Sequence, residues 1–218
     1  MRSHETRSSG TISKRAAGER GYALVALLAL MTVLMIVMMA AAPSIQQQSR
    51  RERELEAVAR GEEVAEAIRL YIRYKRQPPT SMEELLDGVT PIGSAKKVYV
   101  LRASAALDPL SKSGEWRTVK VNDPAFINFV KELTVYANGR LPNKTNDPAL
   151  AAFAQQIPQV TGILDLGEKE ETAPCGEEAS TSSDGPFIGV ASRNQCASII
   201  TYYGIERHDQ WVFTPFFR

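Results

Sequence analysis

The sequence has few of the residues that enzymes and metal proteins place at their sites. Its 218 residues include only two cysteines and two histidines. It contains no P-loop, no dinucleotide-binding glycine pattern and no nucleophile elbow. Lysine and arginine number 26 against 25 acidic residues, so broad electrostatic attraction to nucleic acid is unsupported. We therefore predict that the protein is not an enzyme, has no catalytic residues and no metal centre, and does not bind nucleic acid.

An uncharged apolar run near the N-terminus is the strongest pattern in the chain. From Tyr22 to Ala42 every residue except Thr32 is apolar, and Pro43 follows. A helix of about 21 residues is about 32 Å long, which is enough to cross a bilayer core of about 30 Å. The run therefore predicts a transmembrane helix over 22–42.

The residues before this run set its expected orientation. The leader 1–21 carries five basic and two acidic residues, so the positive-inside rule keeps it in the cytoplasm and exports everything after Pro43. Ala40 and Ala42 imitate a signal-peptidase site. However, the run is longer than the roughly 7–15 apolar residues of a secretory signal, and Pro43 would stand just past the cut. A retained anchor is favoured over ordinary secretion.

A helical pattern continues beyond the apolar run. Apolar residues recur at spacings of three and four, and opposite charges at Glu56/Arg60 and Glu66/Arg69 lie at helical spacing on a solvated face. Pro78 and Pro79 end the pattern. We predict one long helix over 22–76, half in the membrane and half a stalk, whose apolar stripe is Leu55, Val58, Ala59, Val64, Ala65, Ile68, Tyr71 and Ile72.

The remaining residues, 77–218, suffice for one modest globular domain. We predict a short helix from Thr80 to Leu86 and another over 124–137. Residues 139–186 read as a long loop insertion with at most one short helix near 149–156. Strands are predicted at 97–101, 116–121, 186–192, 197–203 and 210–213. The predicted fold class is α+β, with the long helix packed on a small antiparallel sheet.

Three features of this domain suggest chemistry. Cys175 and Cys196 fit neither a redox CxxC pair nor a zinc site, and in an oxidising compartment they predict a structural disulfide. His208 beside Asp209 is interpreted as part of a surface turn. An acidic stretch could bind Ca²⁺, although it lacks the D-x-D-x-D-G spacing and a solvated loop is the simpler interpretation; its residues are Glu168, Glu170, Glu171, Glu177, Glu178 and Asp184.

Several segments resemble one protein family. Glu19, Arg20 and Gly21, followed by the aromatic Tyr22 at the head of the apolar helix, resemble the prepilin cleavage and methylation site of type IV pilins and type II secretion pseudopilins. The stretches QPPTSMEELLDG, LDPLSKSGEW and GPFIGVAS…SIITYYG…HDQWVF resemble pseudopilin segments. The resemblance implies that prepilin peptidase cuts between Gly21 and Tyr22 and methylates Tyr22. It also implies a helix kink at Pro43, and some family members hold calcium in a C-terminal loop.

The resemblance further implies a structural subunit that supports protein secretion. Its partners would be other pilin or pseudopilin subunits, prepilin peptidase, the inner-membrane assembly platform and membrane lipid, with the domain 77–218 in the bacterial periplasm. The family usually has glutamate where this chain has Ala26, which favours a minor or tip-type subunit. The alternatives are an unprocessed single-pass anchored periplasmic binding protein and, third, an anchored hydrolase.

Overall fold

The computed structural model describes residues 16–139, 141, 147–155, 157, 175–176, 178–180 and 185–217. For residues 16–20 and 40–44 it describes the backbone alone. The fold class is α+β, as predicted. The chain divides into two compact units, Met1–Gln48 and Ser49–Arg218. The first unit, where described, is helix alone, and the second holds the globular part of the protein.

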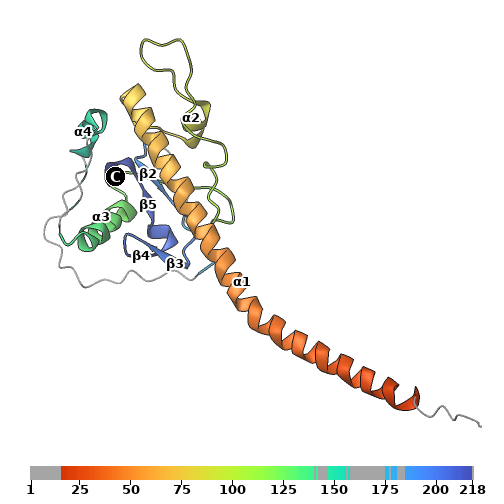
Figure 1. Ribbon diagram of the computed structural model, residues 1–218. Helices are drawn as coiled ribbons and strands as arrows, with labels where there is room; N and C mark the ends of the chain where they lie inside the picture. The colour runs from red at the N-terminus through yellow and green to blue at the C-terminus, as the bar shows by residue number, and fades with distance from the viewer. Residues whose placement is uncertain are drawn as a thin grey trace, which may run out of the picture. The chain divides into compact units, whose positions relative to one another are not determined.

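A single long helix, α1 (Ala16–Lys75), is the largest element and runs from red to yellow in Figure 1. Arg73 and Lys75 in its last turn lie where cations complement the helix dipole. The helix ends at Arg76, which adopts a left-handed φ of 62° and donates its backbone N–H to the Ile72 carbonyl at 2.8 Å. Pro78 and Pro79 follow, so the helix ends where the sequence predicts.

In the second unit one face of α1 is buried. Its core residues include Ala57, Val64, Ala65, Ala67, Ile68, Tyr71 and Ile72. The predicted stripe was wrong at its N-terminal end, where Leu55 and Ala59 are exposed and Glu54 is buried. Successive helical residues are about 100° apart around the axis, so a stripe through Ala57 and Gly61 includes position 54 and turns position 55 outward.

Two small antiparallel sheets complete the architecture. β1 (Arg117–Val119), β2 (Gly189–Ala191) and β5 (Val212–Phe213) form a sheet in the order β1-β2-β5. β3 (Ala197–Tyr202) and β4 (Ile205–Arg207) form a hairpin joined by Tyr203 and Gly204. Both joining residues have positive φ (52° and 81°), as a two-residue type I′ turn requires.

The short helices follow their caps. α2 (Met82–Asp87) begins after Ser81, whose side chain accepts the backbone N–H of Glu84. α3 (Pro124–Tyr136) and α4 (Pro148–Ala154) begin after Asp123 and Asp147, whose carboxylates accept the backbone N–H two residues on. The helices predicted at these places are confirmed. Most of the predicted loop insertion lies outside the described residues.

One strand prediction was wrong, one strand was missed, and the last strand is shorter than predicted. Residues 97–101 are not a strand, because the chain pairs only at Val98, which exchanges two backbone hydrogen bonds with Val89 and then turns away. The sequence also missed β4. The strand predicted over 210–213 is limited to β5 (Val212–Phe213). Two short 3-10 helices flank it, η1 (His208–Gln210) and η2 (Pro215–Phe217).

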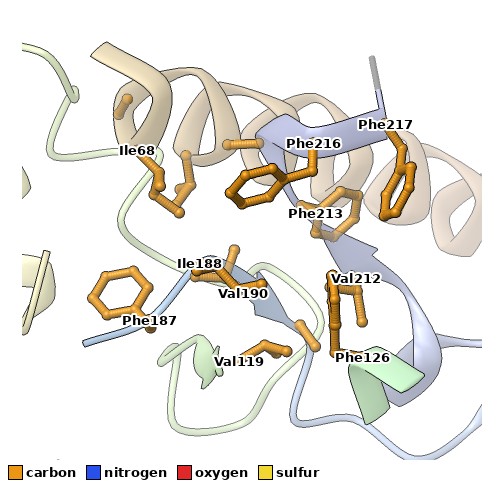
Figure 2. Close-up of a cluster of buried hydrophobic side chains, with 14 of the residues drawn as sticks. Ile68, Val119, Phe126, Phe187, Ile188, Val190, Val212, Phe213, Phe216 and Phe217 are labelled. Atoms are coloured by element: carbon orange, nitrogen blue, oxygen red, sulfur yellow. The ribbon is translucent and has the colours of Figure 1, made fainter. Parts of the chain in front are cut away.

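The core lies where α1, the three-stranded sheet and α3 meet (Figure 2). Phe213 on β5 packs against Gly61 of α1, and its ring meets Trp116 edge-on at 5.7 Å between centroids. Trp116 and Trp211 are buried and each donates its indole N–H to a backbone carbonyl, of Ala105 at 2.9 Å and Ile205 at 3.0 Å. Buried aromatic residues with satisfied polar atoms therefore anchor the long helix to the sheet.

Candidate functional site

The apolar half of α1 has the length and composition of a membrane span. Residues 21–39 form the candidate span, and none of their side chains is buried by the rest of the described chain. Thr32, in the middle of this span, donates its hydroxyl to the Ala29 carbonyl at 2.8 Å. Because this bond satisfies the hydroxyl within the helix, Thr32 presents no unpaired donor to a surrounding apolar medium.

The predicted cleavage site lies at the start of this span. Gly21 lies inside α1, and a Cβ built on it would meet no heavy atom within 4 Å. Tyr22 is 79 % exposed, and Ala26 one turn later is also exposed. The Gly21–Tyr22 bond is therefore not covered by the described chain. Its cleavage and the methylation of Tyr22 stay predictions.

Pro43 lies within α1, which continues helical to Lys75. A proline inside a helix removes one backbone hydrogen bond and commonly bends the axis. The predicted kink at this position stays a prediction.

A buried acid–histidine pair lies at the other half of α1. The Glu54 carboxylate is fully buried, and its Oε1 lies 3.0 Å from Nε2 of His208. The same carboxylate accepts the backbone N–H of Ile199 at 2.9 Å and of Ile200 at 2.9 Å. Arg50, one turn earlier, brings Nε to 3.6 Å from Glu54 and donates to the Ala197 carbonyl. Helix α1 thus holds β3 and η1 through one carboxylate.

The interpretation of His208 as a surface residue was wrong, because its side chain is 2 % exposed. Burial lowers its pKa below the ordinary value of 6.5, and this effect outweighs the hydrogen bond that the ring makes to Glu54, which raises the pKa. A neutral imidazole ring makes the hydrogen bond to Glu54 by donating its Nε2 proton. Its other nitrogen, Nδ1, is buried and has no hydrogen-bond partner among the described residues. Trp211 packs edge-on against the ring at 5.0 Å. The histidine bonds a carboxylate of the fold and no nucleophile.

A disulfide joins Cys175 and Cys196, with their Cα atoms 4.5 Å apart. Cys196 precedes β3, so the bridge attaches the end of the loop insertion to the hairpin. The crosslink closes a loop of about 20 residues and limits the unfolded chain, which stabilises the fold by about 3 kcal/mol. Its role is structural.

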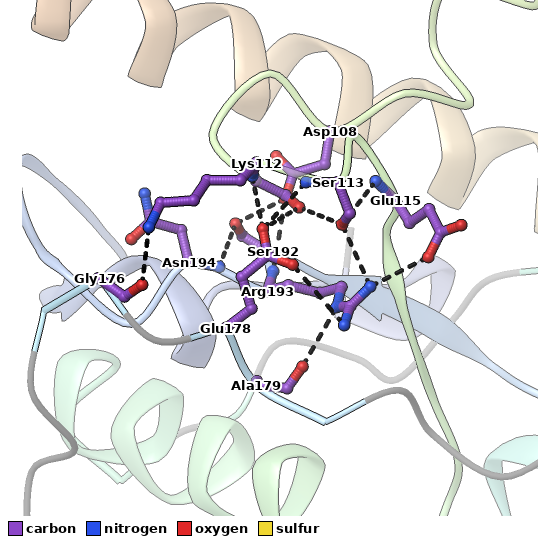
Figure 3. Close-up of polar contacts among 11 residues, drawn as sticks. Asp108, Lys112, Ser113, Glu115, Gly176, Glu178, Ala179, Ser192, Arg193 and Asn194 are labelled. Carbon is purple, nitrogen blue, oxygen red and sulfur yellow. Dashed lines mark hydrogen bonds and ion pairs between the residues drawn. The ribbon is translucent and has the colours of Figure 1, made fainter.

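Glu178 is the one member of the predicted acidic cluster inside the described residues. Its carboxylate accepts Lys112 N at 2.5 Å, Ser113 N at 3.0 Å and Ser111 Oγ at 2.9 Å (Figure 3). These donors, the Ser113 N–H foremost, lower the pKa of Glu178 to about 2. A carboxylate already bonded to three protein donors is poorly placed to hold a cation, and the described residues contain no acidic, histidine or cysteine group that fits a metal ion.

Arg193 extends this network at the end of β2. Its guanidinium donates to Ala179 O at 3.1 Å, Ser113 Oγ at 3.1 Å and Glu115 Oε2 at 3.0 Å. Beside it, buried Asp108 accepts Ser192 Oγ at 2.7 Å and Leu110 N at 2.9 Å. Burial raises the pKa of Asp108 above its ordinary value although these donors act to lower it. The network binds residues 108–115 to the strand, so it is a structural junction.

Sequence reasoning missed Glu54, Arg193 and the burial of His208. For Glu54 a signal exists: it lies three residues before Ala57 and seven before Gly61, on the helix face that is buried. A carboxylate in register with an apolar face predicts a buried partner. No comparable pattern marks Arg193, whose contacts come from two segments distant in sequence, 108–115 and 178–179.

No protein-family model, curated protein or solved structure matches the chain. Its function is therefore inferred from the contacts described above.

Proposed function

We propose that the protein is a structural subunit of a type II secretion pseudopilus or type IV pilus-like filament, of minor or tip type. In this proposal prepilin peptidase removes the leader after Gly21 and methylates Tyr22. The apolar helix rests in the bacterial inner membrane, with the globular unit in the periplasm, and then leaves the lipid to pack with helices of other subunits. Its role is mechanical and supports protein secretion.

The observation that carries the proposal is the composition of α1. One uninterrupted helix, Ala16–Lys75, has a first part that nothing in the described chain covers and a second part buried in the globular core. A core helix of a soluble protein would bury its apolar side chains. A helix whose leading half stays uncovered needs lipid or other helices as its surroundings.

The surface of the leading half suits helix packing. Ala23, Ala26 and Ala29 recur at a spacing of three and are exposed. Small residues let helix backbones approach closely, and close van der Waals packing drives association between apolar helices. The same surface can therefore exchange lipid contacts for contacts with other subunits.

Ala26 supports the assignment as a minor or tip-type subunit. A carboxylate at this position would neutralise the amino terminus of a neighbouring subunit inside an apolar filament core, where an unpaired charge is costly. Ala26 cannot do so. A subunit with no neighbour above it loses nothing by this absence.

Mass analysis of the N-terminus tests the proposal. The full chain is produced with a working prepilin peptidase and extracted from the membrane. We expect a mature chain that begins with methylated Tyr22. Gly21→Val should block cleavage, because a side chain at the residue before the cut obstructs the peptidase.

Gly18→Val is the matched control, because it adds the same side chain three residues upstream. It should be cleaved like the parent chain. An intact leader in the parent chain, while the same peptidase matures another substrate, contradicts the proposal. That result would favour the alternative, an unprocessed membrane-anchored periplasmic interaction protein.

A further inference from the structure

An arginine-lined cleft lies at the C-terminal end of α1. The open cleft measures about 530 Å³ and is bounded by Arg69 and Arg73 of α1, by Arg76 directly after it and by the start of α4. Its lining residues are Arg69, Arg73, Arg76, Asp147, Pro148 and Ala149. Positions 69 and 73 are spaced by four, so their side chains share one helix face, and Arg76 follows the last helical residue, Lys75. Figure 1 shows α4 near this end of the helix.

The three arginines differ in what they contact. Arg69 donates through Nε to Glu66 at 2.9 Å and through Nη1 to Asp147 at 3.3 Å. Arg73 and Arg76 are exposed, and neither guanidinium has a hydrogen-bond or ion-pair partner among the described residues. The cleft therefore contains one arginine already held by carboxylates and two whose planar groups are open.

The backbone of Arg76 adds an independent observation. Its φ of 62° lies in the left-handed region, where glycine commonly ends helices and other residues are strained. The chain accepts an arginine at this position although glycine would end the helix with less strain. Strain of this kind persists where the side chain serves another purpose.

We propose that this cleft binds an acidic peptide segment of a partner protein, with carboxylates of that segment on Arg73 and Arg76. Arginine and carboxylate meet through two parallel hydrogen bonds, and Arg69 already pairs this way, with Nε and Nη2 donating to the two carboxylate oxygens of Glu66. The proposal holds whether or not Tyr22 becomes the mature N-terminus.

The cleft favours carboxylates over a phosphate-rich ligand. Asp147 lines the same space, with a side chain 14 % exposed, and Glu66 stands beside Arg69. A dense polyanion such as nucleic acid would be repelled by these acids, whereas single carboxylates spaced along a peptide can alternate with them. Pro148 and Ala149 add an apolar wall for the aliphatic part of such a peptide.

Fluorescence anisotropy on the full chain in detergent tests this proposal. The probe is a short fluorescent peptide in which glutamate alternates with alanine. The double variant Arg73→Gln/Arg76→Gln should weaken its binding by about tenfold or more, because two charge-assisted contacts are lost. Arg73→Lys/Arg76→Lys keeps the charge and should still weaken binding several-fold, because lysine lacks the planar fork.

Arg51→Gln/Arg53→Gln is the matched control, since both arginines are exposed on the same helix outside the cleft. It should change the affinity less than about twofold. Equal losses in the two double variants would overturn the proposal. The proposal would also be overturned if a peptide with glutamine in place of glutamate bound equally well. Displacement of the probe by inorganic phosphate at the same concentration as by unlabelled peptide would overturn it too.

Arg76→Gly separates binding from structure. It removes the strain, so the midpoint of thermal unfolding should stay equal or rise while peptide binding weakens. A lower midpoint with unchanged binding would make Arg76 purely structural and overturn the proposal. Peptide binding that occurs only after Glu168→Gln/Glu170→Gln/Glu171→Gln would also overturn it, because the occupant would then be the acidic segment of the chain itself.

Discussion

Two glycines of the same helix show how differently its halves are used. A Cβ on Gly21 would meet nothing within 4 Å, whereas a Cβ on Gly61 would overlap the ring of Phe213. The first half of α1 is uncovered along its whole described length, and the second is packed to the point where one methyl group does not fit. A substitution in the second half of the helix therefore affects the stability of the globular unit, whereas a substitution in the first half affects contacts with whatever surrounds the helix.

The two halves also treat polarity differently. In the apolar span 21–39 of the first half, the hydroxyl of Thr32 is satisfied by its own helix. In the second half a charged residue, Glu54, is buried and satisfied by β3 and η1. A membrane-type segment satisfies its polar groups internally, while a globular segment can satisfy them through distant parts of the chain.

Glu54→Ala should have the largest effect on the globular unit. It leaves His208 and the N–H groups of Ile199 and Ile200 without their acceptor, so we expect a loss of about 3–5 kcal/mol in the free energy of unfolding. Denaturant unfolding followed by the fluorescence of the buried Trp116 and Trp211 measures it. Glu56→Ala removes an exposed ion pair with Arg60 and should cost less than about 1 kcal/mol. Equal losses would contradict the role of Glu54.

Truncating one apolar side chain in each half sharpens the comparison. Ile68 is fully buried, and Ile68→Ala should lower the free energy of unfolding of the globular unit by about 2–5 kcal/mol through lost burial and the resulting cavity. Leu28 is 55 % exposed, and Leu28→Ala should change it by less than about 0.5 kcal/mol. The same unfolding assay serves both. A large loss for Leu28→Ala would mean that the leading half packs into the globular core.

Gly61→Ala tests the tight contact with Phe213. The added methyl group forces the ring aside, which should cost about 1–3 kcal/mol in unfolding free energy. Gly21→Ala, in open space, should leave the globular unit unchanged. In a double-mutant cycle, Phe213→Leu should reduce the cost of Gly61→Ala, because the shorter side chain makes room. Additive losses would show that the two residues are not coupled.

The smallest expected effect is a pH dependence from His208. Because its folded pKa lies below 6.5, the unfolded chain binds a proton first as pH falls, and stability drops below about pH 6.5 until the folded pKa is reached. The slope is at most about 1.4 kcal/mol per pH unit. Glu54, Arg50 and Asp108 also act on this ring.

Comparison with His208→Gln isolates this contribution. The difference between the parent and variant unfolding free energies should change between pH 7 and pH 5, and stay constant above pH 7. A constant difference across the whole range would show that His208 does not titrate differently in the folded state.

Most of the fold was predictable because its signals are local. The caps at Ser81 and Asp123 and the apolar runs at β2 and β3 can each be recognised within a few residues, and the length of α1 follows from one continuous helical pattern. The strand predicted at 97–101 failed because its pattern matches a strand while only Val98 finds a partner. β4 was missed because three residues carry too little pattern, and its pairing depends on the turn at Tyr203 and Gly204.

The candidate site was only partly predictable for the same reason. The apolar span is contiguous and visible in the sequence, and Cys175 and Cys196 had only each other to pair with. The Glu54–His208 contact joins residues 154 positions apart and depends on how the chain folds back. In the sequence, His208 next to Asp209 is typical of a surface turn, and only the structure shows that its ring faces α1.

The outer edge of β3 has a consequence for how the protein can assemble. Arg50 donates to the Ala197 carbonyl while Glu54 accepts from Ile199 and Ile200, so two side chains of α1 occupy the main-chain positions that another strand would use. Exposed strand edges invite pairing between molecules and aggregation. With these three main-chain groups occupied by the helix, pairing of another strand along this part of β3 is disfavoured.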